Sequence, residues 1–269
     1  MTSFEEILIC IQHPDQATRR AGEIHYHQLQ SVPEYADIVS TFASDTTKSP
    51  HLRQLAIVLM NQQVGRAWRD FNQPSKERIV QLAFNGCCAE VVVIRHSSML
   101  LLSKIVSQMP LTESRDILSH LSRTLMAPDL FSMSWTLRCL CAVADEVNDD
   151  LLLEVVKHCY HRILELVSTL DPSNTQLLRY AAKLMRQCVQ KFGNARMACG
   201  FEMDSMTIVE QFLASWTNAA VQWLKVHCCH RVEDIPIRLG VILELLRGIT
   251  AALEAFPGDQ RNLTYTLST

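Results

Sequence analysis

Glycine is scarce in this sequence, and long apolar runs are absent. Only eight of the 269 residues are glycine, and none belongs to a glycine-rich loop of the kind that cradles phosphate groups. The most apolar stretch, residues 89–106, is interrupted by Arg95, His96 and Lys104. It therefore falls short of the roughly 20 apolar residues of a membrane span. The acidic start, MTSFEEILIC, lacks the basic segment of a signal peptide. We expect no membrane insertion.

An excess of basic charge is also missing. The chain has 25 Lys and Arg against 28 Asp and Glu, for a formal net charge of −3. Proteins that bind nucleic acid need clustered cations to neutralise the phosphates. The charge therefore argues against direct nucleic-acid binding.

Cysteine, by contrast, is plentiful, with ten residues in the chain. Two pairs are adjacent, Cys87–Cys88 and Cys228–Cys229, and others lie among Leu, Ala and Val in helical patterns. Cysteines in such settings are small buried hydrophobes of a reducing compartment rather than a disulfide framework. We expect free thiols and an intracellular protein.

Motifs of enzymes and metal sites are lacking. No His-Glu-x-x-His or Gly-x-Ser-x-Gly sequence occurs. The cluster His227–His230 (HCCH) has poor spacing for a tetrahedral zinc site, and the end of a helix explains it better. His158 and His161 are three residues apart and could chelate, although a solvated polar face is the commoner arrangement. We expect no enzymatic activity, no metal and no cofactor.

The period of the apolar residues is helical throughout. In 177–189 the apolar positions form one wide stripe, and Arg179, Lys183, Arg186 and Gln190 take the other face. Prolines fall between such segments or in their first turns, where a missing N–H costs little. No run shows the alternation of a half-buried strand. The sequence predicts an all-α protein.

The predicted helices pair along the chain. We expect six pairs over 1–257, a loop at 193–205 between the fifth and sixth, and a tail at 258–269. The pairs cover about 4–30, 34–64, 75–107, 113–147, 151–192 and 206–256. The fold class that this predicts is a right-handed α-α superhelix, a solenoid of HEAT repeats.

An arginine recurs early in the second helix of the last five pairs, at Arg53, Arg95, Arg138, Arg179 and Arg238. The first three intervals, 42, 43 and 41 residues, lie within the roughly 40–47 residues of HEAT and armadillo repeats. The last interval, 59 residues, includes the expected loop.

The stretch RQLAIVLMNQQVGRAW (53–68) resembles the N-terminal domain of importin-β (karyopherin-β) nuclear transport receptors, with its Arg-Gln-x-Ala, Leu-Lys-Asn and Trp positions. Met60 stands where the family usually has lysine. Residues 15–30 resemble the family's first-repeat helix, with Gly22 in place of alanine and His27 in place of a hydrophobic residue. Later segments, such as SWTLRCLCAVADEV, are most similar to the importin-nine branch. Within 53–68, the positions that match the importin-β pattern are Arg53, Gln54, Ala56, Leu59, Asn61 and Trp68.

This resemblance implies a receptor that shuttles between cytoplasm and nucleus in nuclear import. It would bind the GTP form of the GTPase Ran, carry cargo proteins on its concave surface and contact nucleoporins on its outer one. Because receptors of the family are several times longer, the chain would be an N-terminal region. The Ran-binding residues implied are Gln28, Asn61, Gln62, Arg66, Arg69 and Lys104.

Two further interpretations stay open. The acidic residues Asp145, Glu146, Asp149 and Asp150 form either a solvated turn or a docking patch for basic cargo such as histones. As a whole, the chain could instead be a HEAT-repeat scaffold that holds a multiprotein complex together without a GTPase switch. The motif at 53–68 favours the transport receptor.

Overall fold

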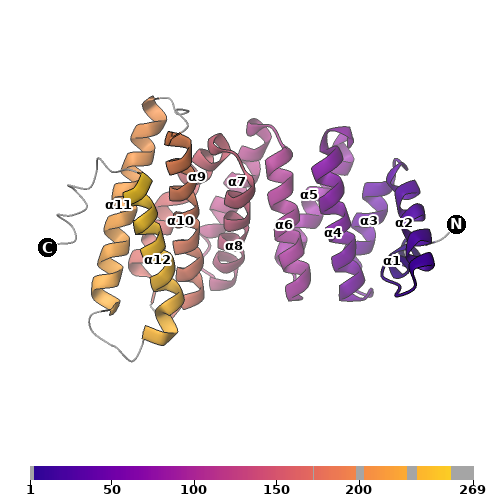
Figure 1. The fold of residues 1–269 in the computed structure, drawn as a ribbon, viewed down its shortest axis with the longest axis horizontal. Coiled ribbons are helices and arrows are strands. Elements are labelled where there is room, and N and C mark those ends of the chain that lie inside the picture. Colours follow the sequence, from indigo (N-terminus) through magenta and orange to yellow (C-terminus); the bar gives the residue numbers. More distant parts are fainter. Residues whose placement is uncertain (1–2, 172, 198–202, 229–234, 256–269) are drawn as a thin grey trace. The chain divides into compact units, whose positions relative to one another are not determined.

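A computed structural model describes residues 3–171, 173–197, 203–228 and 235–255, and in these ranges the chain is all-helical, with no strand (Figure 1). The predicted all-α class is confirmed. A short 3-10 helix, η1 (Trp68–Asp70), follows α4. The α-helices are α1 (Phe4–Ile11), α2 (Gln16–Gln30), α3 (Tyr35–Ser44), α4 (Pro50–Ala67), α5 (Gln73–Cys87), α6 (Val92–Gln108), α7 (Leu111–Leu125), α8 (Leu130–Glu146), α9 (Asp149–Thr169), α10 (Thr175–Met197), α11 (Met203–Cys228) and α12 (Ile235–Ala255).

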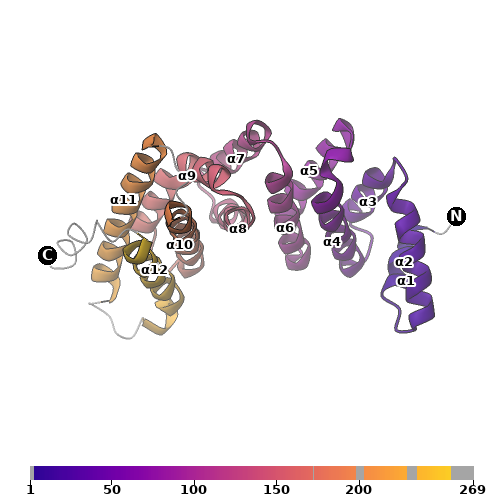
Figure 2. The ribbon, with the colours of Figure 1, turned by 45° about the horizontal axis from the view of Figure 1, so that its top comes forward.

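The helices form two compact units, Met1–Met109 and Pro110–Thr269. In each unit an odd-numbered helix, here called an A helix, packs against the even-numbered B helix that follows it. A helices also pack on A helices, as in α1–α3–α5 and α7–α9–α11, and B helices on B helices, as in α4–α6 and α8–α10–α12. Figures 1 and 2 show α4 and α6 side by side, with α3 and α5 behind them. Each unit therefore has the two-layer arrangement of an α-α solenoid.

Local signals explain where the helices begin. The Ser3 hydroxyl accepts from the backbone N–H of Glu6, whose carboxylate in turn accepts from the N–H of Ser3, so a reciprocal capping box starts α1. Asp15 and Asp129 cap α2 and α8 through backbone N–H groups. These backbone donors hold the pKa of both aspartates below the ordinary value.

The core lies between the A and B layers of each unit. In α10, Leu177, Leu178, Ala181, Ala182, Leu184, Met185, Cys188 and Val189 are all buried. This confirms the predicted apolar stripe.

The predicted loop at 193–205 is too long. Helix α10 continues to Met197 and α11 begins at Met203, so at most 198–202 separate them, and those residues lie outside the described ranges. Gly193 stays within the helix because it costs only about 1 kcal/mol relative to alanine, which neighbouring turns outweigh. The predicted tail at 258–269 also lies outside the described residues.

The recurring arginines bind the turn between paired helices. Nε of Arg53 donates to the carbonyl oxygen of Ala43 at 2.8 Å, near the end of α3. Arg95 likewise binds the carbonyl of Ala89, and Arg238 that of His227. A cation at the carboxyl end of a helix satisfies carbonyls that lack a partner there and opposes their partial negative charge. The recurrence of arginine at this position therefore has a structural cause in these three pairs.

Arg19 extends this pattern to α2, a position that the sequence analysis missed. Its Nη1 donates to the carbonyl oxygens of His13 and Pro14 at 2.9 and 2.8 Å. Arg138 and Arg179 depart from the pattern and contact other B helices instead.

We expect Arg53→Ala to lower the free energy of unfolding by about 1–3 kcal/mol, because a buried carbonyl loses its donor. Arg53 is only 9% exposed. Arg19→Ala is the control, since it removes the same charge and similar bonds at a solvent-accessible turn. Its effect should stay within about 0.5 kcal/mol. Urea unfolding followed by circular dichroism measures both, and equal losses would contradict the explanation.

Candidate functional site on the B helices

The residues of the family-like motif are mostly structural. Ala56 is fully buried, Leu59 is buried, and Trp68 is 3% exposed within η1, where its ring meets Phe71 and the ammonium group of Lys76. Trp68 thus packs beneath the connection between α4 and α5. The motif holds the second and third helix pairs together, so any partner must contact its exposed neighbours.

Asn61 is half-buried on α4. Its Oδ1 is out of contact with solvent and has no hydrogen-bond partner among the described residues. Leaving such a group unpaired costs about 1–3 kcal/mol. Of the residues implied by the resemblance, Asn61 is therefore the least available to a partner.

Gln62, Arg66 and Lys104 are brought together around Gly65. Gln62 and Arg66 lie one turn apart on the exposed face of α4, as their spacing predicts. Lys104 comes from α6, and a Cβ atom built on Gly65 would stand 3.6 Å from Cδ of Lys104. The Lys104 stem therefore lies over α4 at Gly65. The two adjacent B helices therefore present one polar and basic surface, which we call the Gly65 patch (Gln62, Arg66 and Lys104).

Gln28 and Arg69 are also exposed, and no hydrogen bond or ion pair in the described part of the chain joins either of them to this patch. Arg66 lies close enough to Tyr26, on α2, for its charge to act on that side chain. Burial raises the pKa of Tyr26, and the positive charge of Arg66 partly opposes this rise. Helix α2 also meets α4 through Gln30 and Gln63, whose amide groups are 3.0 Å apart. Gln28 shares that helix, whereas Arg69 lies beyond α4, in η1.

The four acidic residues do not form one free cluster. The side-chain amide of Gln187 binds the carboxylate of Asp145, and Lys191 donates to the backbone oxygen of the same residue at 3.0 Å. Asp149 and Asp150 lie in the first turn of α9, where carboxylates favourably oppose the partial positive charge of the helix. Helix stability therefore explains the presence of these two residues.

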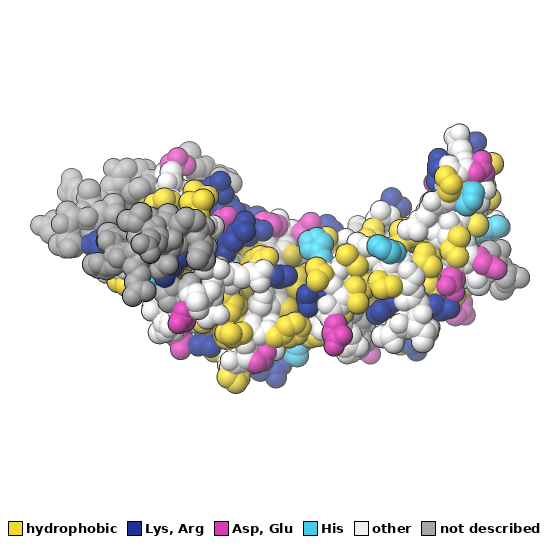
Figure 3. Space-filling model, turned by 90° about the horizontal axis from the view of Figure 1, so that it is seen from below, with side chains coloured by type: hydrophobic (Ala, Val, Ile, Leu, Met, Phe, Trp, Pro, Cys, Tyr) yellow, Lys and Arg dark blue, Asp and Glu magenta, His cyan; other side chains and the backbone are white. Residues whose placement is uncertain are grey.

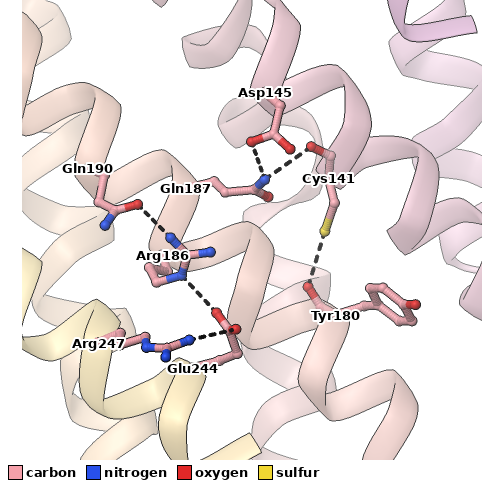
Figure 4. A network of polar contacts seen from close by, with 8 residues as sticks. All are labelled: Cys141, Asp145, Tyr180, Arg186, Gln187, Gln190, Glu244 and Arg247. Carbon is pink, nitrogen blue, oxygen red and sulfur yellow. Dashed lines mark hydrogen bonds and ion pairs between the residues drawn. The ribbon is translucent and has the colours of Figure 1, made fainter. Parts of the chain in front are cut away.

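A polar network that the sequence analysis missed links the B helices of the second unit (Figure 4). Nε of Arg186 on α10 is 2.7 Å from Oε2 of Glu244 on α12, and Nη1 of Arg247 is 3.6 Å from the other carboxylate oxygen. Gln187 on α10 also donates to the backbone oxygen of Cys141 on α8 at 3.3 Å. Glu244 is 8% exposed, and the two arginines compensate its charge.

A depression of about 470 Å³ lies between α1 and α3. Its charged side chains already have partners: Nζ of Lys48 is 2.6 Å from the carboxylate of Glu5, and Asp37 pairs with Arg78 at 3.2 Å. The carboxylate of Asp45 accepts from the backbone N–H and the hydroxyl group of Thr47. It offers no uncommitted acid, base or nucleophile.

Buried thiols are unreactive in this fold. None of the seven cysteines whose side chains are described forms a disulfide. Burial raises the pKa of Cys141 and Cys159 to about 12, so the thiolate that acts as nucleophile or metal ligand is rare at neutral pH. The described residues contain no group of three or more His, Cys, Asp or Glu that could hold a metal ion. The cluster 227–230 lies mostly outside them.

None of the described helices is both long enough and apolar enough to cross a membrane.

Comparison with known proteins finds no matching family and no matching curated protein. Similar solved structures include two engineered proteins, with 11% and 14% identity and TM-scores of 0.46 and 0.47, which cover 95% and 94% of this chain and 98% and 99% of their own. Another is a designed armadillo repeat protein in complex with the peptide (KR)4, with 12% identity, a TM-score of 0.44 and coverage of 94% and 98%. These likenesses are distant, and the assignment to helical repeats rests on the helix pairing within each unit.

Proposed function

We propose that this chain is the N-terminal region of an importin-β-type nuclear transport receptor. In this proposal it binds Ran in its GTP form, carries protein cargo and contacts nucleoporins. The observation that carries the proposal is the Gly65 patch, which adjoins the family-like motif and combines side chains of two B helices. The resemblance at 53–68 supports the same assignment. Ran-GTP and cargo would compete or couple across the repeat surface, so that the nucleotide state controls cargo release.

The patch suits an acidic protein partner. Arg66 and Arg69 have no ion pair among the described residues, and both are exposed. Lys104 adds a third positive charge from α6. Charges at the rim of an interface mainly accelerate encounter and select the partner. In the proposal, the motif positions the patch and Gln28 extends the contact along α2.

A pull-down with Ran locked in its GTP or GDP state tests the function directly. We expect retention of the GTP form and little retention of the GDP form. Equal retention of both forms, or of neither, would contradict the proposal and leave the structural scaffold as the better hypothesis.

We expect Arg66→Glu/Arg69→Glu to weaken Ran-GTP binding several-fold by reversing two charges at the interface rim. The matched control is Arg78→Glu/Arg123→Glu, which changes the net charge equally on A helices. Both of its arginines are exposed, and the surface ion pair of Arg78 contributes little. Titration of labelled Ran-GTP measures the affinities, and circular dichroism checks the fold. Unchanged affinity in the first variant would remove these two arginines from the site.

A further inference from the structure

Three cations of the second unit surround Tyr180 on the B helices. The guanidinium carbon of Arg138, on α8, lies 4.8 Å from the centroid of the Tyr180 ring, on α10. Arg179 lies on α10 and crosses to α12, where a Cβ atom built on Gly240 would stand 3.3 Å from its Cδ. Lys183 follows Arg179 by one helical turn. We call Arg138, Arg179 and Lys183 the Tyr180 patch.

The charges of this patch are unpaired. None of its three cations forms an ion pair within the described ranges, and Nε of Arg138 is out of solvent without a hydrogen-bond partner there. The next turn of α10 differs, because Arg186 pairs with Glu244. Asp145, the neighbouring acid on α8, is bound by Gln187. Because these nearby acids are bound by other side chains, the three cations repel one another, and an anionic partner would relieve that repulsion.

The positions of the cations fit an extended peptide. Cβ atoms four residues apart on a helix are separated by about 5–6 Å, and packed helices by about 8–10 Å. Alternate side chains of an extended chain point the same way about 6.6 Å apart. Carboxylates at alternate positions of a peptide could therefore meet Arg179 and Lys183 in turn. The guanidinium group of Arg138 lies over the ring of Tyr180 at a cation–π distance, and a guanidinium can form paired hydrogen bonds with a carboxylate.

Exposed leucines adjoin the patch. Leu239, Leu243 and Leu246 are 48%, 41% and 47% exposed on α12, and Leu239 directly precedes Gly240. In Figure 3 dark blue side chains gather in the second unit, with magenta and yellow ones next to them. Such a stripe offers apolar anchor sites for a bound peptide.

We propose that the Tyr180 patch and the adjacent leucines of α12 bind an acidic, leucine-containing peptide segment of a partner protein. The inference goes beyond the proposed Ran binding, because it uses other residues in the other unit. Nucleic acid fits less well, since three cations neutralise little of a backbone that carries one charge per about 1.7 Å. This acidic partner is opposite in charge to the basic cargo that the sequence analysis considered for the acidic residues at 145–150.

The test uses fluorescence anisotropy with the whole chain and a labelled peptide in which Glu alternates with Leu and Ser. A second peptide carries Gln for every Glu, and single-stranded DNA is the third probe. We expect the acidic peptide to bind at least about tenfold more tightly than the Gln peptide, with an affinity that falls as salt screens the charges. Equal binding of the two peptides, no binding of the acidic one, or tighter binding of DNA would overturn the inference.

Arg179→Glu/Lys183→Glu should weaken binding of the acidic peptide by about tenfold. Arg78→Glu/Arg123→Glu, with the same change in net charge, should leave it unchanged; an equal loss there would point to net charge alone and contradict the patch. Urea unfolding establishes that both variants are folded. Arg179→Gln/Lys183→Gln, which introduces no repulsion, should lose affinity to a smaller degree. Ran-GTP binding of Arg179→Glu/Lys183→Glu should match the unmodified chain, so failure of either proposal is recognised separately.

Discussion

The substitution Gly248→Ala is expected to lower the free energy of unfolding of the second unit by about 3 kcal/mol, at the upper end of overpacking effects. A Cβ atom built on Gly248 would overlap Cη2 of Trp216 and stand 2.8 Å from Cζ2 of the same ring. Trp216 is fully buried, so its rigid ring has no space to move into. The gain in helix propensity, about 1 kcal/mol, is too small to offset the clash.

Gly65→Ala is the matched control and should have the opposite sign. The nearest atom to its new Cβ would be Cδ of Lys104 at 3.6 Å, an ordinary contact with a flexible side chain. That substitution should stabilise the first unit by about 0.5–1 kcal/mol, through helix propensity. Urea unfolding with hydrogen exchange of the affected helices measures both. A stabilising Gly248→Ala would contradict the packing described for α11 and α12.

Gly86→Ala should destabilise the first unit by about 3 kcal/mol for a related reason. The new Cβ atom would overlap Oγ of Ser98 and stand 2.6 Å from Cβ of Ser98, across the contact between α5 and α6. Rotation of the hydroxyl cannot relieve the second clash, because Cβ moves only with the backbone of α6. The two helices would have to separate.

The variant Gly86→Ala/Ser98→Gly provides the internal test. It adds a methyl group to α5 and removes the hydroxymethyl group that faces it on α6, so it should recover part of the loss. The interaction energy of the double-mutant cycle should be at least about 1 kcal/mol in favour of the pair. Strict additivity of the two substitutions, in urea unfolding of the four proteins, would show that the two positions are not in contact.

Gly22 illustrates how packing explains a departure from the family-like pattern. The resemblance at 15–30 has alanine at this position. A Cβ atom on Gly22 would stand 2.8 Å from Cβ of Cys10 and 2.9 Å from the backbone nitrogen of Ile11. Helices α1 and α2 are thus too close for alanine. The sequence identified the substitution, but only the approach of the two helices explains it.

The fold was predictable where its causes are local. Capping residues, prolines and apolar stripes lie within a few residues of the structure they determine, as for Ser3 and the start of α1. The pairing of Glu244 with Arg186 spans 58 residues, and periodicity alone does not reveal such a partner. In the candidate site, Gln62 and Arg66 share a face because they lie four residues apart on α4. The position of Lys104 beside them depends on the contact between α4 and α6.

The arginine contacts to the inter-helix turns carry a consequence for folding kinetics. The bonds of Arg19, Arg53, Arg95 and Arg238 join residues only 5 to 11 positions apart. Bonds between successive helix pairs span 29 to 58 positions, as for Arg162 with Met133 and Arg186 with Glu244. Closing a short loop loses less chain entropy, and local contacts speed folding. Each helical hairpin can therefore form, with its arginine in place, before it docks on its neighbour.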